Sequence, residues 1–404
     1  MTCRRIDSAT PVVALKMTRS LVQHGVLGIA RSLGRLGVDV HWVHGCPDAP
    51  AGWSRYVTAS HAISASSRET ERWLDQLSAV GAGLARRPVL VATDDPSAAL
   101  VAEHAAVLQR WFRFRAAPAD VTRALSDKRR LHSLCRSLGV DTPDAWFPES
   151  GADVERYAAD GAFPVVVKRV DATAVAGCAV PSVTIVRTPA ALRDLLQRCG
   201  ERRFGGLMVQ EYVPGDASSV WMFEGYFDDR SACLVGFTGR KIRQHPPHTG
   251  MTSLGVAAEN PAVTEAATRL MAAIGYRGPV DMGFRYDERT GAFRLLDVNP
   301  RIGATFRLFV DTRGLDVVRA MYLDLTDQRV PARAGVEPGR RWMVEHTDVL
   351  TALRLGREGT LSVAEWARSL RGLRECAWLS VRDPLPALVL GTALIRQRRG
   401  RGAA

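Results

Sequence analysis

Short apolar runs that alternate with helix-spaced segments constrain the fold more than any other feature of this sequence. In the first 115 residues they predict strands at 12–15, 38–43 and 88–93, and helices at 29–36 and 96–108. Strands that alternate with helices along a chain favour a parallel sheet covered by helices. We therefore expect a Rossmann-like α/β domain over residues 10–120.

The pattern changes after residue 120, where strands come in hairpins with helices between them. We expect a helix at 128–138 and strands at 163–170, 183–186, 207–213, 220–226, 232–238, 280–286 and 293–298. This pattern predicts an α+β domain at 121–335, divided into subdomains at 121–206 and 207–335. From residue 340 onward the pattern predicts helices, so we expect a helical C-terminal extension with a basic tail at 336–404.

The basic residues are almost all arginine, and this bias limits what the net charge of +12 says about function. Fifty arginines stand beside four lysines, at positions 16, 128, 168 and 241. A general preference for arginine explains most surface cations, so the charge is weak support for nucleic-acid binding. Lysine is a compact point charge that arginine does not replace at every site. The four lysines are therefore either chance survivors or functional positions.

Cysteine spacing and hydropathy exclude several classes of protein. The seven cysteines stand singly without a CxxC pair, which indicates neither a zinc site nor a disulfide framework. No apolar run reaches the ~20 residues that a membrane-spanning helix needs. The first residues also lack the pattern of a signal peptide. We expect a protein of the reducing cytoplasm.

Several charged residues stand where their setting indicates chemistry. Lys168 lies within the apolar segment FPVVVKRV, where an ammonium group needs a nearby anion. Asp297 and Asn299 stand two residues apart at a strand end, so their oxygens face one side and can share a hard cation. Arg301 follows and can bind phosphate or carboxylate oxygens. Such a set suits magnesium-nucleotide chemistry, although each feature alone is more often a solvent-reaching lysine or a turn.

The order of these elements carries a resemblance to a known family. A helix that opens with Asp-Lys, then FPVVVK, LMVQEYVPG, the basic loop GRKIR and finally LLDVNPR resembles the ATP-grasp superfamily. The segments GVLGIARSLGRLGVDV and WSRYV are similar to the domain that precedes ATP-grasp in carboxylate–amine ligases. The tail, with LSVAEWARSL and DPLPAL, resembles the extension of a group described as ATP-dependent carboligases.

The resemblance implies roles for individual residues. It implies nucleotide contacts by Lys128 and Lys168 (α- and β-phosphates), Glu211, Tyr212 and Val213 (adenine) and Asp216 (ribose), although the family often places the ribose acid at the position of Ser218. It implies that Lys241 and Arg243 reach the γ-phosphate, that Arg301 steadies an acyl phosphate, and that Asp297 and Asn299 hold Mg²⁺, or Mn²⁺.

Two departures from the family pattern bear on the site. The family has a carboxylate metal ligand on the strand before the final hairpin, and this sequence has Gly283 there. Asp281 lies two residues earlier on the same strand face and can supply the carboxylate, unless it is simply buried against a backbone group or an arginine. The phosphate-covering loop after Lys168 is glycine-rich in the family, whereas here it has only Gly177.

The expected protein is therefore a magnesium- and ATP-dependent ligase that joins a small-molecule carboxylate to an amine through an acyl phosphate. The acceptor could instead be a thiol, or bicarbonate chemistry could operate. Gly283 leaves open an ATP-grasp protein that binds nucleotide without catalysis. A nucleic-acid or anionic-membrane binder is a weaker alternative. For residues 386–401, a helix docked on the body with a basic end is favoured over peripheral membrane contact. The oligomeric state stays open.

Overall fold

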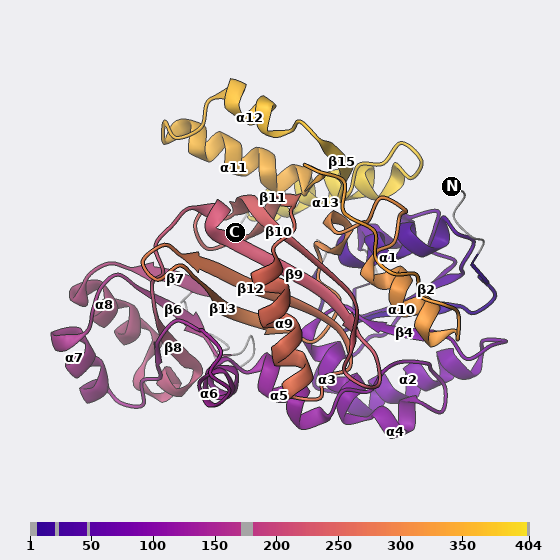
Figure 1. Cartoon of the computed structure of the whole chain (residues 1–404), viewed down its shortest axis with the longest axis horizontal. Helices are drawn as coiled ribbons and strands as arrows, with labels where there is room; N and C mark the ends of the chain where they lie inside the picture. The colour runs from indigo at the N-terminus through magenta and orange to yellow at the C-terminus, as the bar shows by residue number, and fades with distance from the viewer. Residues whose placement is uncertain (1–5, 21–23, 47–48, 171–180, 402–404) are drawn as a thin grey trace.

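The computed structural model describes residues 6–20, 24–46, 49–170 and 181–401, and it contains three sheets (Figure 1). The phosphate-covering loop with Gly177 lies outside the described residues. The fold is mixed α/β. The first part of the chain forms a four-stranded parallel sheet, and the later part forms a four-stranded antiparallel sheet and a seven-stranded sheet.

The first sheet is parallel and has the strand order β3-β2-β1-β4. Its strands are β1 (Val12–Lys16), β2 (Val40–His44), β3 (Ala59–Ala62) and β4 (Val89–Ala92), and its helices are α1 (His24–Gly34), α2 (Thr70–Ala82), α3 (Asp95–Glu103) and α4 (Ala105–Leu108). The strand β1 is completely buried because helices cover both faces of the sheet. The parallel sheet is as predicted, but β3, with the polar sequence ASHA, was not expected.

The second sheet is small and antiparallel, with the order β5-β8-β6-β7. It consists of β5 (Ala145–Trp146), β6 (Val165–Arg169), β7 (Val183–Val186) and β8 (Leu207–Glu211), with α7 (Gly151–Asp160) and α8 (Pro189–Cys199). Buried side chains such as Val154 of α7 and Leu192 of α8 pack with Val165 and Val167 of β6 into one core. Alternate residues of β6 therefore face the helices, and Lys168 points the other way.

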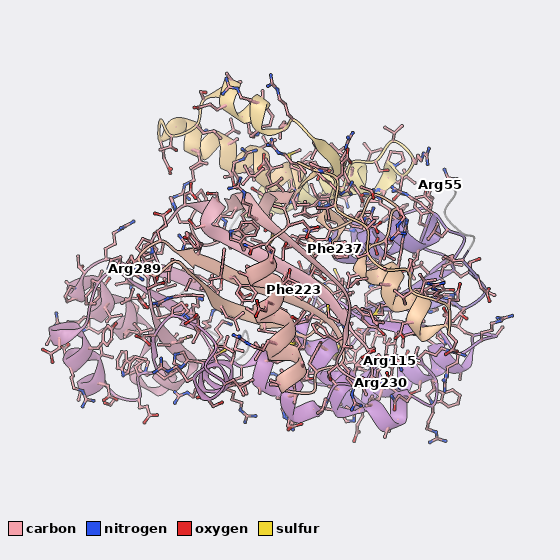
Figure 2. All side chains as sticks on the ribbon, in the orientation of Figure 1. Arg55, Arg115, Phe223, Arg230, Phe237 and Arg289 are labelled. Carbon is pink, nitrogen blue, oxygen red and sulfur yellow. The ribbon has the colours of Figure 1, made fainter. Side chains whose placement is uncertain are left out.

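The third sheet has seven strands in the order β13-β12-β9-β10-β11-β14-β15. They are β9 (Val220–Phe227), β10 (Cys233–His245), β11 (Met251–Ala257), β12 (Gly278–Asp287), β13 (Ala292–Asn299), β14 (Arg341–Met343) and β15 (Leu373–Cys376). The helix α9 (Pro261–Ala273) crosses this sheet, and Phe223 of β9 lies beneath it (Figure 2). The last two strands correct the expectation of a purely helical C-terminal extension.

The remaining helices connect these sheets. They are α5 (Ala119–Ser126), α6 (Lys128–Ser137), α10 (Val317–Leu325), α11 (Glu345–Arg357), α12 (Val363–Ser369) and α13 (Leu385–Arg401), with the short 3₁₀ turns η1 (Pro50–Trp53), η2 (Glu201–Gly206), η3 (Ala217–Ser219) and η4 (Phe306–Leu308). Among the described residues, no helix is both long and apolar enough to cross a membrane.

A buried ion pair joins the C-terminal part to the first sheet. Arg31 of α1 donates from Nε to Asp383 Oδ2 at 2.8 Å and from Nη2 to the Trp378 carbonyl at 2.7 Å. Both Arg31 and Asp383 are about 1% exposed, and Ser54 donates to the same carboxylate at 2.8 Å. The start of α13 is thus docked on the body of the protein.

The described cysteines include four free thiols, at positions 46, 135, 233 and 376. Cys199 is disulfide-bonded, which the single spacing of the cysteines did not predict.

Candidate active site

Four cationic side chains from four elements of the fold lie near enough for their charges to interact at Lys168. Lys168 lies on β6, Lys128 begins α6, Lys241 lies on β10 and Arg285 on β12. Burial lowers the pKa of Lys168 to about 8; Asp297 opposes this shift, and the charges of Lys128, Lys241 and Arg285 add to it. The three lysines are half-buried, and the mutual repulsion of like charges held away from water is offset by a bound anion. The cluster therefore favours a ligand with several negative charges.

Hydrogen bonds hold two lysines of this group in place. The Lys128 backbone N–H donates to the carbonyl of Val170 at 3.4 Å, which sets the start of α6 against the end of β6. Lys241 Nζ donates to the Gly250 carbonyl at 2.9 Å and to Gln244 Oε1 at 3.3 Å. Burial also lowers the pKa of Lys241, while Asp297 and Asp281 oppose that shift. The cations thus face the carboxylates of β12 and β13.

A group of oxygen-bearing side chains lies on these two strands. Asp281 pairs across the ladder with Asn299, and Gly283 pairs with Asp297. The Asn299 amide nitrogen stands 3.3 Å from Asp281 Oδ2 and 3.3 Å from Asp297 Oδ2. The prediction that the Asp281 side chain points toward Asn299 and Asp297 is confirmed. Asp281 also pairs with an arginine, which was the alternative role expected for it, because Arg301 Nη1 donates to Asp281 Oδ2 at 3.2 Å.

Steric crowding explains why position 283 has no side chain. A Cβ atom added to Gly283 would clash with Asp297 Oδ1, so the Asp297 carboxylate occupies the space above the glycine. The space that a family carboxylate at position 283 would occupy is therefore taken by the Asp297 carboxylate, and the Asp281 carboxylate lies nearby.

The oxygen-bearing group fits a metal ion only together with further ligands. Within the described ranges, no three or more His, Cys, Asp or Glu side chains are arranged to hold a metal by themselves. Magnesium, however, is usually bound by one or two carboxylates together with substrate phosphates. Asp281 and Asp297 provide two carboxylates, and rotating the Asn299 amide by half a turn would present its oxygen to the same space. This donor set fits magnesium shared with a phosphate ligand.

A buried glutamate that the sequence analysis missed completes the group. Glu224 of β9 lies beside Asp281 in the ladder and is fully buried. Its Oε1 accepts from the Gly303 backbone N–H at 2.8 Å, while no described residue partners Oε2. Burial, and then the charge of Asp281, raise the pKa of Glu224 well above its usual value. The signal was present in the sequence, since VWMFEGYF is an apolar strand with one charge, just as FPVVVK is.

The segment expected to contact adenine and ribose is tied to the large sheet. Glu211 accepts from Arg289 Nη2 at 2.6 Å and from Arg294 Nη1 at 2.5 Å. Arg285 donates to the carbonyls of Pro214 and Gly215, and its guanidinium lies 5.9 Å from the centre of the Tyr212 ring. These contacts fix the path of the chain between the small sheet and the large one, and Val213 is buried there.

The two candidate positions for the ribose contact lie together. Asp216 Oδ1 accepts from the Ser218 backbone N–H at 2.8 Å and from the Ser218 hydroxyl at 2.7 Å. These hydrogen bonds lower the pKa of Asp216. The acid that the family pattern has at position 218 is thus replaced by a serine that orients the acid two residues earlier.

Arg243 does not lie where the sequence analysis expected it. It was expected at the γ-phosphate with Lys241, but its guanidinium is buried and makes two hydrogen bonds of 2.9 Å to Asp348 of α11. A third bond of 2.6 Å reaches the Ser369 hydroxyl. A bulge between Lys241 and Arg243 breaks the strand alternation that would give them one face. Arg243 therefore holds α11 on the sheet and is not grouped with the other cations.

The carboxyl edge of the parallel sheet meets the carboxylate group through Arg301. Its Nε donates to Asp95 Oδ1 at 3.1 Å, at the start of α3. Lys16, at the end of β1, is fully buried, donates to Thr18 Oγ1 at 2.7 Å and lies 3.9 Å from Asp94 Oδ2. Burial lowers the pKa of Lys16 to about 8, and the charge of Arg301 contributes. Ligands of α/β proteins bind at this edge, so Lys16 is a further polar group that the sequence analysis did not assign.

Solved structures with a similar fold place this site in context. An L-amino acid ligase from Bacillus licheniformis has a TM-score of 0.59 at 17% identity, over 78% of this chain and 74% of that one. N5-carboxyaminoimidazole ribonucleotide synthetase from Thermus thermophilus has a TM-score of 0.58 at 16% identity, over 82% and 81%. The biotin carboxylase domain of the Hydrogenobacter thermophilus 2-oxoglutarate carboxylase, solved with MgADP and bicarbonate, gives 0.60 at 15%, over 81% and 73%.

The chain therefore has the same fold as these ligase and carboxylase structures, in agreement with the resemblance of its motif order. Among curated proteins, it is 22% identical over 261 residues to D-aspartate ligase from Enterococcus faecium, which is 62% of this chain and 61% of that ligase. It is 22% identical over 207 residues to the N-terminal section of the carbamoyl phosphate synthase large chain from Methanopyrus kandleri, covering 48% and 34%. It thus spans less than two thirds of either relative. No protein-family model matches.

Proposed function

We propose that this chain is an ATP-dependent ligase that activates a substrate carboxylate as an acyl phosphate and couples it to an amine. The observation that carries the proposal is the group of cations around Lys168, which faces the carboxylates of Asp281 and Asp297. The likeness in fold to an L-amino acid ligase and the sequence relation to a D-aspartate ligase support the same reaction class.

In this proposal the cation group binds the phosphates of ATP. Lys128, Lys168 and Lys241 lose part of their mutual repulsion when a polyphosphate lies among them, which makes the ligand the missing counter-charge. The backbone of Glu211, Tyr212 and Val213 binds adenine, and Asp216 accepts a hydrogen bond from the ribose. The protein positions and neutralises the reacting groups, which is the main contribution in phosphoryl transfer.

Asp297, Asn299 and Asp281 are the residues that would hold magnesium. Magnesium supplies charge neutralisation between the phosphate groups. Nothing in the donor set or in the similar structures favours Mn²⁺. Burial and the charge of Asp281 raise the pKa of Glu224, which disfavours a second negative charge beside Asp281.

Arg301 is proposed as the residue that steadies the acyl phosphate. Asp95 and Asp281 fix its guanidinium on two sides, at 3.1 and 3.2 Å, so it spans the parallel sheet and the carboxylate group. The carboxylate and amine substrates would then lie along the carboxyl edge of the parallel sheet, near Lys16. In the final step the amine attacks the acyl carbon, phosphate leaves, and the amine nitrogen gives up a proton.

A screen of ADP release tests this function. Purified protein with MgATP would be incubated with pairs of amino acids and small carboxylic acids, and ADP and phosphate measured. The proposal expects release that requires both partners and is lost in Lys168→Met. ATP binding without stimulated release by any pair would favour a nucleotide-binding protein that does not catalyse. Absence of ATP binding would reject both.

A further inference from the structure

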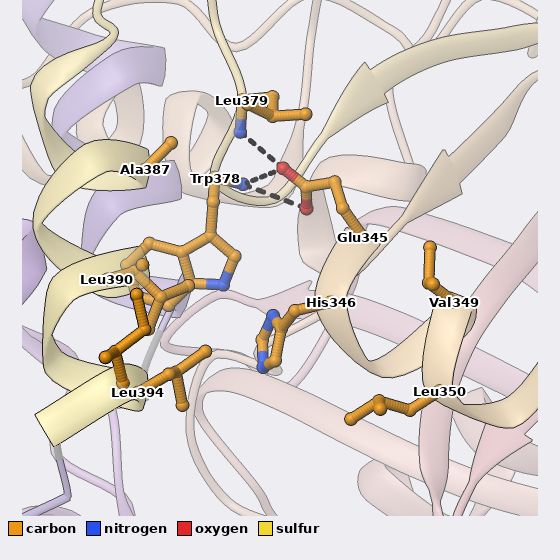
Figure 3. A pocket seen from close by; sticks show the side chains of 11 residues that line it. Glu345, His346, Val349, Leu350, Trp378, Leu379, Ala387, Leu390 and Leu394 are labelled. Atoms are coloured by element: carbon orange, nitrogen blue, oxygen red, sulfur yellow. Dashed lines mark hydrogen bonds between the residues drawn. The ribbon is translucent and has the colours of Figure 1, made fainter. Parts of the chain in front are cut away.

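A second cavity lies away from the cation group, between α11 and α13 (Figure 3). Its volume is about 610 Å³, within the range of small-molecule sites. The α13 residues that line it are Ala387, Leu390, Gly391, Leu394 and Ile395, which is one stripe at helical spacing. Val349 and Leu350 of α11 form the opposite wall. The lining of the cavity is mostly apolar.

Two polar atoms without partners lie in this apolar lining. Trp378 is 1% exposed, yet no described residue accepts a hydrogen bond from its indole Nε1–H. The same holds for His346 Nδ1, which has no described partner. Figure 3 shows the indole nitrogen on the side that faces His346 and the space between the helices. Burying a donor without an acceptor is costly, so these atoms indicate a ligand with a hydrogen-bonding group.

The other polar group of the lining is already satisfied. Glu345 accepts from the backbone N–H groups of Trp378 and Leu379, as the dashed lines in Figure 3 mark. Burial lowers the pKa of His346, so at neutral pH its ring offers one donor and one acceptor. The cavity thus presents an apolar wall with hydrogen-bonding capacity at one place only.

The C-terminal part of the chain that forms the cavity also holds most of the exposed apolar side chains. Of thirteen large apolar side chains found exposed in the described part of the chain, nine lie between residues 349 and 395. Exposed apolar residues concentrated in one region mark an interaction site. Scattered exposure would need no such explanation.

We propose that this cavity binds the linear acyl chain of an amphiphile, with a carboxylate or ester carbonyl oxygen of that molecule accepting from Trp378 Nε1–H. The stripe along α13 follows the chain for two turns, and the single pair of free polar atoms matches a molecule with one polar end. The chain can come from a free fatty acid or from a phospholipid. This binding is independent of the ATP reaction, because none of the lining residues belongs to the cation group.

A substitution at Gly391 can block the cavity. A Cβ atom at Gly391 meets no atom within 4 Å, and leucine favours a helix more than glycine does. Gly391→Leu therefore places a large side chain in the cavity, and its Cβ meets no clash. Leu388→Ala is the matched control, because Leu388 lies on the same helix, is 64% exposed and does not line the cavity.

The test measures binding of lauric acid to the full chain by calorimetry, and co-sedimentation with phosphatidylcholine vesicles containing phosphatidylglycerol. We expect Gly391→Leu to abolish binding, Leu388→Ala to retain it, and Trp378→Phe to weaken it about fivefold through loss of one hydrogen bond. Binding of lauric acid alone assigns a free amphiphile, and vesicle binding that Gly391→Leu abolishes assigns a membrane lipid. Binding that Gly391→Leu leaves unchanged, or binding of neither probe, overturns the proposal.

Discussion

Replacing Lys168 by methionine separates a phosphate-binding lysine from one that merely reaches solvent. The folded state lowers the pKa of Lys168 from 10.5 to about 8. One pKa unit corresponds to about 1.4 kcal/mol, so keeping the ammonium charged costs at most about 3 kcal/mol, less whatever solvent reaches the site. Lys168→Met removes this cost, and we expect the ligand-free protein to gain up to about 3 kcal/mol in free energy of unfolding.

The same substitution has the opposite effect on nucleotide binding. A charge-assisted hydrogen bond contributes about 1.5–3 kcal/mol, so we expect ATP affinity to fall by about 10- to 150-fold. The ligand-free stability of the wild type should also rise with pH between about 8 and 10.5, because there the unfolded lysine still binds a proton that the folded one has lost. Lys168→Met should remove that slope.

Urea unfolding without ligand and calorimetric titration with MgATP measure the two effects on one sample. Arg187→Met is the control, since Arg187 is an exposed cation just after β7. A Lys168→Met protein that is less stable than the wild type and binds ATP with unchanged affinity would refute the reasoning. Lys168 would then be an ordinary strand lysine whose stem packs on its neighbours.

Four further substitutions probe the rest of the site. Asp281→Asn should raise the magnesium concentration needed for half-maximal ADP release at least about tenfold, and an unchanged requirement would remove this residue from the metal group. Gly283→Asp should destabilise the fold by about 1–3 kcal/mol in urea unfolding, because the added Cβ clashes with a carboxylate, and gain of activity would contradict this. Arg243→Met should cost about 3–5 kcal/mol by leaving Asp348 buried without its partner, with ATP affinity of the folded protein unchanged; a selective loss of affinity would restore its phosphate role. In the wild type the raised pKa of Glu224 should make stability fall as pH rises from its unfolded pKa to its folded one, and a Glu224→Gln variant with the same pH slope would show that this group does not titrate there.

The parts of the fold that the sequence predicted are those with strong periodicity. The buried strand β1 and the hairpin of β12 and β13 each have a run of apolar or alternating residues, so their burial was readable. The strand β3 has the polar sequence ASHA, and β14 has three residues. Both join a sheet because neighbouring strands offer free hydrogen-bonding edges, which is a tertiary cause that no local pattern records.

The site could be predicted where its residues are close together in the sequence or stand out within one strand. Asp297 and Asn299 share a strand end, and Lys168 is one charge in an apolar strand. Arg243 was misassigned because the ladder is irregular on both sides of it, between Lys241 and Arg243 and between Arg243 and Gln244, so the two-residue alternation expected from the sequence does not hold there. Lys16 could not be assigned, since its closeness to Arg301 depends on how the parallel sheet meets β13.

The pairing of Arg31 with Asp383 has a consequence for how the protein is made. The two residues are 352 positions apart, so at about 5–20 residues per second the ribosome completes Asp383 roughly 20–70 s after Arg31. During that interval the nascent chain holds a guanidinium and a helix face that belong in the interior, and the seven-stranded sheet lacks its last edge strand. We expect chaperones that shield apolar surface to bind this protein during synthesis, and release to follow the emergence of residues 373–383.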